Sequence, residues 1–354
     1  MHVLDSNRRN QFSISNNIQR HCVQSSPTTW LTYFTTHVIS KILLGDGVYP
    51  LEINPIGLAA TVYIINGLFF TPFASRNNSI KSVGSRNLIL IALIGIAELA
   101  GLITYFFGMK DASSINASIF SNGEIIFSLL ITITIFREKL RRCELTPIFM
   151  IIFGMMILPI IFDFYQNGLT MSNIVFGDML LIVAGIFYAI DVNICKFVSS
   201  RVSSTRITQL YSFFAGGIAL VLLVIFQIPY HINLEQLAPI SLLAILGTGL
   251  ATIFFLMALR LIGAIKTIMI YSTTSIFGII FSGTILLETV TLTDVISILL
   301  VISGIYLLRR RFDDKENTNQ SDHLKINDKI KKIPLKQKRN LRTYLETNLH
   351  LKTG

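Results

Sequence analysis

Apolar runs of about 20 residues alternate with short polar breaks over most of the chain. Runs of this length are typical of helices that cross a bilayer. They must be helical, because a lipid-exposed backbone has to satisfy its own hydrogen bonds. We predict nine clear spans, at residues 55–73, 88–108, 117–136, 145–162, 176–198, 207–228, 237–259, 267–287 and 295–308. A tenth, at 28–44, is more polar because it contains several threonines, His37 and Lys41.

The second half of the chain repeats the first. At an offset of 150 residues, Glu138 aligns with Glu288 and Gly154 with Gly304. Upstream the offset becomes 155, and residues 33, 39 and 41 then match residues 188, 194 and 196. This match supports a helix at 28–44, since its partner at 176–198 is a clear span. Glu138 and Glu288 each end a span, so we expect them to fix helix ends or loops.

Five spans per repeat place the two halves in opposite orientations. The expected fold is an all-α integral membrane protein of ten transmembrane helices, built as two inverted five-helix repeats. The predicted organisation is a polar segment at 1–27, repeats at 28–162 and 163–308, and a basic tail at 309–354. Inverted repeats are typical of secondary transporters that rock around a midplane site. A duplication with no surviving mechanism is the alternative.

Composition excludes several classes of protein. Hydrophobic residues make up 52% of the 354 residues and charged residues only 14%, with a mean hydropathy of +0.61. Soluble domains usually contain about 25% charged residues. The main body is therefore neither a soluble enzyme, a disordered protein nor a nucleic-acid-binding domain. The net charge of +10 lies mostly in residues 309–354, which hold 13 Lys or Arg and 6 Asp or Glu. This basic tail either lies on anionic lipid headgroups or is a solvated, disordered segment.

Basic residues occupy alternate loops. One set of loops contains Arg76, Lys81, Arg86, Arg137, Lys139, Arg141, Arg142, Arg201, Arg206, Arg260 and Lys266. The opposite set has Lys110 but no Lys or Arg in 163–175, 229–236 or 288–294. The positive-inside rule places the basic loops and the C-terminus in the cytoplasm. With ten spans, the N-terminus is cytoplasmic too, and we expect a multi-pass protein of the plasma membrane.

Glu98 lies midway along its span, on one helical stripe with Gly101 and Tyr105. A charged side chain at the bilayer centre costs about 2.5–3.5 kcal/mol on insertion scales, so something usually justifies it. Glu98 is either a cavity carboxylate that binds a cation or exchanges a proton, or a protonated glutamate bonded to a neighbouring helix. We expect Tyr105 to share its cavity.

A polar stripe recurs in both repeats. It consists of Ser121, Glu124, Ser128 and Thr132 in one half and Tyr271, Thr274, Gly278 and Ser282 in the other, with Ser275 beside it. Spacings of three, four and four residues keep these side chains on one helix face. The two stripes predict either two helices facing a shared cavity or tight packing through small residues.

The sixth span contains Asp191 and Lys196. Asp191 either reaches the cavity or neutralises Lys196. Lys41, the repeat equivalent of Lys196, either snorkels to the interface or attracts an anionic substrate group.

Residues 108–120, GMKDASSINASIF, lead to a span that ends with Glu138 and is followed by Gly154. Residues 258–279 lead in the same way to Glu288 and Gly304. Each half resembles an EamA-type module of the drug/metabolite transporter superfamily. The resemblance implies transport of amino acids, amines or similar metabolites, and it favours export. A drug or sugar-type carrier of the same superfamily, or a non-transporting membrane receptor or assembly protein, is the alternative.

Motifs for other chemistry are missing. The sequence has no P-loop, HExxH, paired Cys/His cluster or G-x-S-x-G elbow. We therefore expect no enzyme activity, no cofactor and no metal. The expected partners are a small-molecule substrate and bilayer lipid, with anionic lipid at the tail; the pattern excludes nucleic acid and is compatible with a homodimer.

Overall fold

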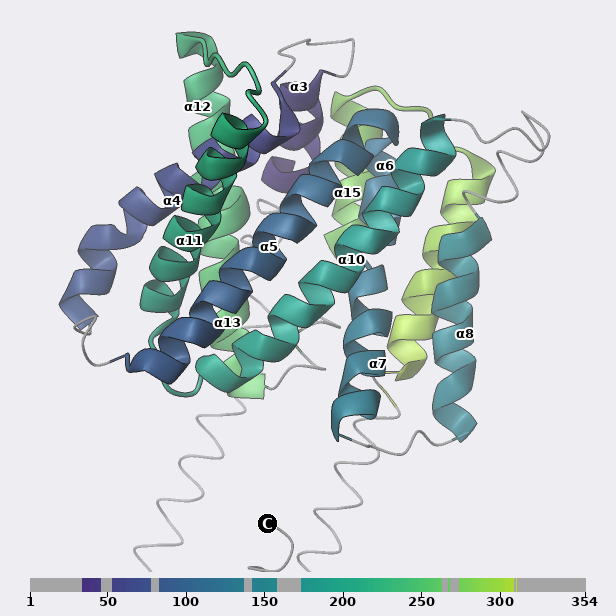
Figure 1. The fold of residues 1–354 in the computed structure, drawn as a ribbon. Helices are drawn as coiled ribbons and strands as arrows, with labels where there is room; N and C mark the ends of the chain where they lie inside the picture. The colour runs from purple at the N-terminus through teal and green to yellow at the C-terminus, as the bar shows by residue number, and fades with distance from the viewer. Residues whose placement is uncertain are drawn as a thin grey trace, which may run out of the picture. The chain divides into compact units, whose positions relative to one another are not determined.

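The computed structural model describes residues 34–45, 53–77, 83–136, 142–157, 173–262, 267, 274–308 and 310. Over these residues the chain is helical and has no strand, and each of the ten predicted spans contains helical residues (Figure 1). Six stretches are long and apolar enough to cross a membrane: Pro55–Ala74, Ser85–Asp111, Ser114–Ile131, Phe176–Val198, Ser204–Ile225 and Leu234–Leu261. Three shorter apolar helices lie at Leu145–Met155, Ser275–Ile285 and Leu292–Leu308. The chain divides into units Met1–Ile305 and Tyr306–Gly354, and the first is described below.

The first repeat follows the predicted order with one interruption. Its elements are η1 (Phe34–Ile39) with α3 (Ser40–Leu44), α4 (Pro55–Asn77), α5 (Ser85–Asp111), α6 (Ser114–Phe120), α7 (Gly123–Phe136) and α8 (Arg142–Ile157). We predicted one helix at 117–136, but the chain turns at Ser121–Asn122 between α6 and α7. The side-chain amide of Asn122 bonds the carbonyl oxygen of Ile119 at 3.0 Å, and this local bond supports the turn.

The second repeat has the same order of spans. Its elements are α10 (Asn173–Val198), α11 (Ser204–Ile225), the chain α12 (Leu234–Leu242), η4 (Leu243–Leu250) and α13 (Ala251–Ile262), then α15 (Thr274–Ile285) and the helix Leu292–Leu308. The middle of the eighth span is thus π-helical, as is the described start of the first. Single-turn π insertions cluster at functional sites in proteins, so both segments are candidates for a functional role.

Equivalent spans of the two repeats pack against each other. α4 contacts α11, α6 at the start of the fourth span contacts α15 of the ninth, and α8 contacts the helix Leu292–Leu308. A Cβ on Gly154 would lie 3.0 Å from the carbonyl oxygen of Ser297, and one on Gly304 would lie 2.8 Å from that of Pro147. Because residues 147 and 154 are the 150-offset equivalents of 297 and 304, this contact is reciprocal. Such reciprocity is that of a pseudo-two-fold relation between the repeats.

α5 and α10 lie side by side, and glycines bring the C-terminal part of α5 against the N-terminal part of α10 (Figure 1). A Cβ on Gly108 would lie 2.8 Å from the carbonyl oxygen of Gly177. A Cβ on Gly177 would lie 2.8 Å from the backbone nitrogen of Ala112. Small residues let membrane helices approach backbone to backbone, where van der Waals contact replaces the missing hydrophobic drive.

Several charged side chains satisfy helix ends. Lys41 donates from Nζ to the carbonyl oxygens of Met109 at 2.9 Å and Ala112 at 2.7 Å, at the C-terminus of α5. The Glu288 carboxylate accepts from the backbone N–H groups of Ser114 at 2.8 Å and Ile115 at 3.0 Å, at the start of α6. These end groups have no intrahelical partner, so charged caps stabilise them. The role expected of Glu288 is confirmed; Glu138 lies outside the described residues.

Candidate functional site

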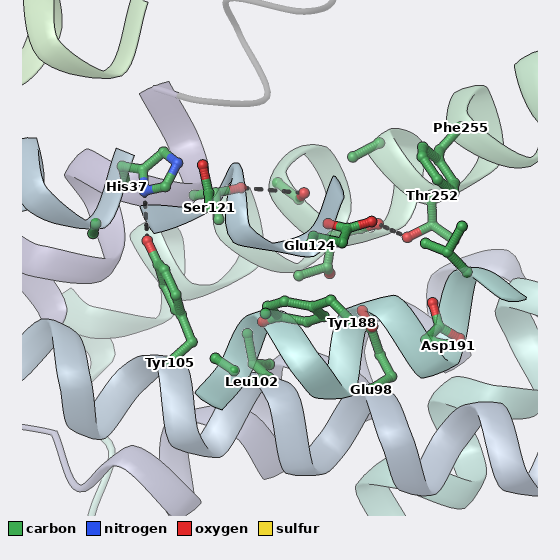
Figure 2. A pocket seen from close by; sticks show the side chains of 18 of the residues that line it. His37, Glu98, Leu102, Tyr105, Ser121, Glu124, Tyr188, Asp191, Thr252 and Phe255 are labelled. Carbon is green, nitrogen blue, oxygen red and sulfur yellow. Dashed lines mark hydrogen bonds between the residues drawn. The ribbon is translucent and has the colours of Figure 1, made fainter. Parts of the chain in front are cut away.

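A cavity of about 130 Å³ lies among the first, third, fourth, sixth and eighth spans. Its described wall consists of Thr36, His37, Glu98, Leu102, Tyr105, Ala117, Ser121, Glu124, Leu181, Ala184, Gly185, Tyr188, Asp191, Val192, Cys195, Gly247, Thr248, Ala251, Thr252 and Phe255. Figure 2 shows polar side chains from several helices turned toward this space. The site therefore draws on both repeats, as a midplane transport site does.

Three carboxyl groups meet in the cavity. Glu98 is the middle residue of α5, Glu124 lies in the first turn of α7, and Asp191 lies on α10. All three side chains line the same space. No lysine or arginine belongs to the wall as far as the chain is described. The cavity is thus suited to protons or cations rather than to anions.

The turn between α6 and α7 brings Ser121 and Glu124 to the wall. α10 passes close by because Gly185 has no side chain, and a Cβ there would lie 3.2 Å from the backbone nitrogen of Glu124. The amide of Asn122 also donates to the hydroxyl of Ser275 on α15 at 2.8 Å.

Repeat-equivalent positions line the cavity in pairs. The pairs are Glu98 with Thr248, Leu102 with Thr252, Tyr105 with Phe255, Thr36 with Asp191, and His37 with Val192. The positions of these residues follow the pseudo-two-fold relation, but the residue types at equivalent positions differ. Glu98 and Asp191 each have a threonine as equivalent, which is small and uncharged. The cavity is therefore symmetric in outline and asymmetric in charge.

The structure brings five of the predicted site residues together: Glu98, Tyr105, Ser121, Glu124 and Asp191 all line the cavity. Ser275 is buried and bonded to Asn122 but does not belong to the wall. Tyr271 lies outside the described residues, as does the side chain of Thr274, the first residue of α15.

The two predicted lysines are not part of the described wall. Lys41 is buried and holds the C-terminus of α5, whereas Lys196 is exposed on α10. Neither lysine lines the cavity in the part of the chain that the structure describes.

Sequence reasoning missed several wall residues. His37 was a single polar residue in a weak span, with no pattern to mark it. Tyr188 carried a signal, since the 155 offset aligns it with Tyr33. Cys195 lies one turn beyond Asp191, and its thiol donates to Oδ1 of that residue at 3.4 Å. An acid and a thiol four residues apart can be seen in the sequence. Such pairs are so common in helices that this spacing does not mark Cys195 as a site residue.

Comparisons with known proteins fit this architecture. An uncharacterized transporter of Methanothermobacter thermautotrophicus is 27% identical over 295 residues, covering 79% of this chain and 84% of that protein. A crystal structure matches with a TM-score of 0.58 at 14% identity, over 81% of this chain and 99% of that chain. At that identity the likeness shows the fold alone.

The family comparison identifies each half separately. The model of the EamA-like transporter family matches residues 24–160 and again residues 175–310. These two matches coincide with the two helical repeats that pack reciprocally around the carboxyl-lined cavity. The protein is a multi-pass membrane protein and belongs to the EamA-like transporter family of the drug/metabolite transporter superfamily.

Proposed function

We propose that this protein moves small amine-bearing metabolites, amino acids or amines, across the plasma membrane in exchange for protons, in the outward direction. One observation carries the proposal. Glu98, Glu124 and Asp191 converge on a single cavity between the repeats, and its described wall has no lysine or arginine.

Three neighbouring carboxylates at membrane depth are costly, because each loses hydration and each repels the others. Protons or an ammonium group relieve that cost. Because both ligands neutralise the same groups, binding one disfavours the other. Competition for one site is what exchange requires, since the empty, fully charged site is then the least favourable species to carry across.

The pseudo-two-fold packing supports alternating access. If the two repeats exchange conformations, the cavity opens first to one side and then to the other while the carboxylates stay central. The difference in charge between the repeats leaves this motion unaffected, because the charges lie on cavity side chains and not in the contacts between helices.

Uptake into proteoliposomes tests the proposal. Wild-type protein should accumulate radiolabelled amines or amino acids against a concentration gradient when the lumen is acidic, and should move protons in return. A panel of neutral sugars in the same vesicles distinguishes the sugar-type alternative. Gradient-driven uptake of sugars, with none of any amine or amino acid, would contradict the proposal.

The proposed orientation places the N-terminus, the C-terminus and the start of α8 in the cytoplasm. Cys143 lies in the first turn of α8 beside Arg142. In a variant without Cys22 and Cys195, a membrane-impermeant thiol reagent should leave Cys143 unlabelled in intact cells and label it after permeabilisation. Labelling of Cys143 in intact cells would reverse the assigned topology.

A further inference from the structure

Four aliphatic hydroxyl groups line the cavity together with the three acids. They belong to Thr36, Ser121, Thr248 and Thr252. A hydroxyl group has one hydrogen that it can donate and two lone pairs that can accept. What each of these groups offers to a ligand therefore depends on where its hydrogen is already used.

The two threonines of the eighth span use their hydrogens on the helix itself. Thr248 Oγ1 donates to the carbonyl oxygen of Ala244 at 2.7 Å. Thr252 Oγ1 donates to the carbonyl oxygen of Thr248 at 2.7 Å, and it accepts from Tyr211 Oη at 3.1 Å. Serine and threonine side chains in helices can bond back to the preceding turn in this way. Each of the two oxygens keeps at least one lone pair for a ligand.

The other two hydroxyl groups follow the same pattern. Ser121 Oγ donates to the carbonyl oxygen of Ser118 at 2.8 Å. Thr36 Oγ1 donates to the carbonyl oxygen of Gly247, which belongs to the opposite repeat, at 3.3 Å. Because the hydrogens are used on backbone carbonyls, these side chains also present their oxygens to the cavity as acceptors.

The carboxyl groups add further acceptors. An ionised carboxylate can only accept, and Glu98, Glu124 and Asp191 lie on three different helices of the wall. His37 and Tyr105 bond each other at one end of the space, and Asp191 lies at the other end (Figure 2). Around the acids, the described wall therefore offers lone pairs from both repeats. A ligand that satisfies them needs hydrogens that point in several directions.

We propose that the cavity recognises an unsubstituted ammonium group through its three N–H hydrogens and discriminates against N-methylated forms of the same compound. This inference rests on the proposed function and narrows its substrate class to primary amines and to amino acids with an unsubstituted amino group. Methylation keeps the positive charge, so the attraction to the acids remains. Each methyl group removes one hydrogen and leaves one wall acceptor without its partner, which weakens binding about fivefold.

Two series of compounds test the inference. Glycine, sarcosine, N,N-dimethylglycine and betaine differ only in the number of methyl groups on nitrogen, as do ethanolamine, its mono- and dimethyl derivatives and choline. Binding is measured by thermal stabilisation of the purified protein in detergent, which reports affinity without requiring transport.

In each series that binds to wild type, the apparent Kd should rise about fivefold with every methyl group. An apparent Kd that stays constant or falls along a series that binds overturns the inference and leaves the proposed function standing. A wild type that binds none of the eight compounds contradicts the proposed function itself.

A double variant, Thr36→Val with Thr248→Val, separates the loss of hydrogen bonds from crowding by the methyl groups. Valine has the shape of threonine, so the space in the cavity is unchanged while two acceptors are removed. The preference for the unmethylated compound over the trimethylated one should fall at least about fivefold. Thr104→Val is the control, because Thr104 Oγ1 bonds back to Ala100 at 2.7 Å on α5 but lies outside the described wall.

The control should keep the wild-type preference. An unchanged preference in the double variant overturns the inference, since crowding alone would then explain the order of affinities in wild type. If the double variant does not fold, the two single variants are measured instead, and the preference has to fall in at least one of them.

Discussion

Glu98→Gln should abolish the accumulation of substrate driven by a pH gradient, while the protein still inserts and still exchanges substrate. Glutamine keeps the shape of glutamate and much of its hydrogen bonding, but it cannot gain or lose the proton. Glu98 lies at the middle of α5, with 13 residues on either side, and its side chain faces the cavity with Glu124 and Asp191. Of the three acids, it is therefore the one closest to the middle of its helix.

The expected effect is large. A gradient of one pH unit stores about 1.4 kcal/mol per proton and so supports about tenfold accumulation in a one-for-one exchange. In proteoliposomes with that gradient, wild type should reach about this ratio, and Glu98→Gln should stay at the ratio measured without a gradient. Counterflow of labelled against unlabelled substrate should persist, since exchange requires binding and motion but no net proton transfer.

The control for this experiment is Glu235→Gln. Glu235 lies in the first turn of α12 and is exposed, so the same chemical change there should leave accumulation intact. If Glu98→Gln matches wild type in both rate and gradient dependence, Glu98 has only a structural role. The coupling role would then have to be sought at Glu124.

Gly177→Leu should destroy the folded protein or leave it without transport. A Cβ at Gly177 would lie 2.8 Å from the backbone nitrogen of Ala112 and 2.9 Å from the carbonyl oxygen of Gly108. These are backbone atoms, so no side chain can rotate away and α5 must separate from α10. Overpacking of a well-packed core typically costs about 1–3 kcal/mol, and a leucine between two backbones should lie at the upper limit or beyond.

Separation of α5 from α10 also moves the site, because α5 carries Glu98 and α10 carries Asp191. The measurements are size-exclusion behaviour in detergent, thermal stability and transport. Gly217→Leu on α11 is the matched control, since nothing lies within 4 Å of a Cβ there and the residue is exposed. Equal stability of the two variants would show that the close approach of α5 and α10 is not needed for folding.

The spans and their repetition could be read from the sequence. Apolar run length marks a membrane helix in any tertiary context, because the bilayer imposes the same thickness on each. The match between the repeats also supported a helix at 28–44 despite its polar residues, and η1 and α3 lie within that range. Glu98, Glu124 and Asp191 could be proposed for the site for a related reason, as an acid at membrane depth is costly wherever its helix lies.

The discontinuity at Ser121–Asn122 was not predictable from hydropathy. Residues 114–136 are mostly apolar, with scattered serine, threonine and asparagine and one glutamate, so the pattern favours one continuous helix. The turn depends on where Asn122 finds its partners, and one of these is Ser275 in the other repeat. A bond between residues so far apart in sequence follows from packing and leaves no local signal.

The all-helical membrane fold, the two repeats, the family and the unusual acids can all be recognised from the order of the residues. What each polar side chain contacts follows from the packing of the helices. Lys41 holds the carbonyls of α5, whereas His37, one turn away, joins Tyr105 in the cavity wall. The physical reason is that span prediction depends on transfer from water to lipid, which is a property of single residues. The use of a side chain depends on which helix face it meets, and the packing of distant segments sets that.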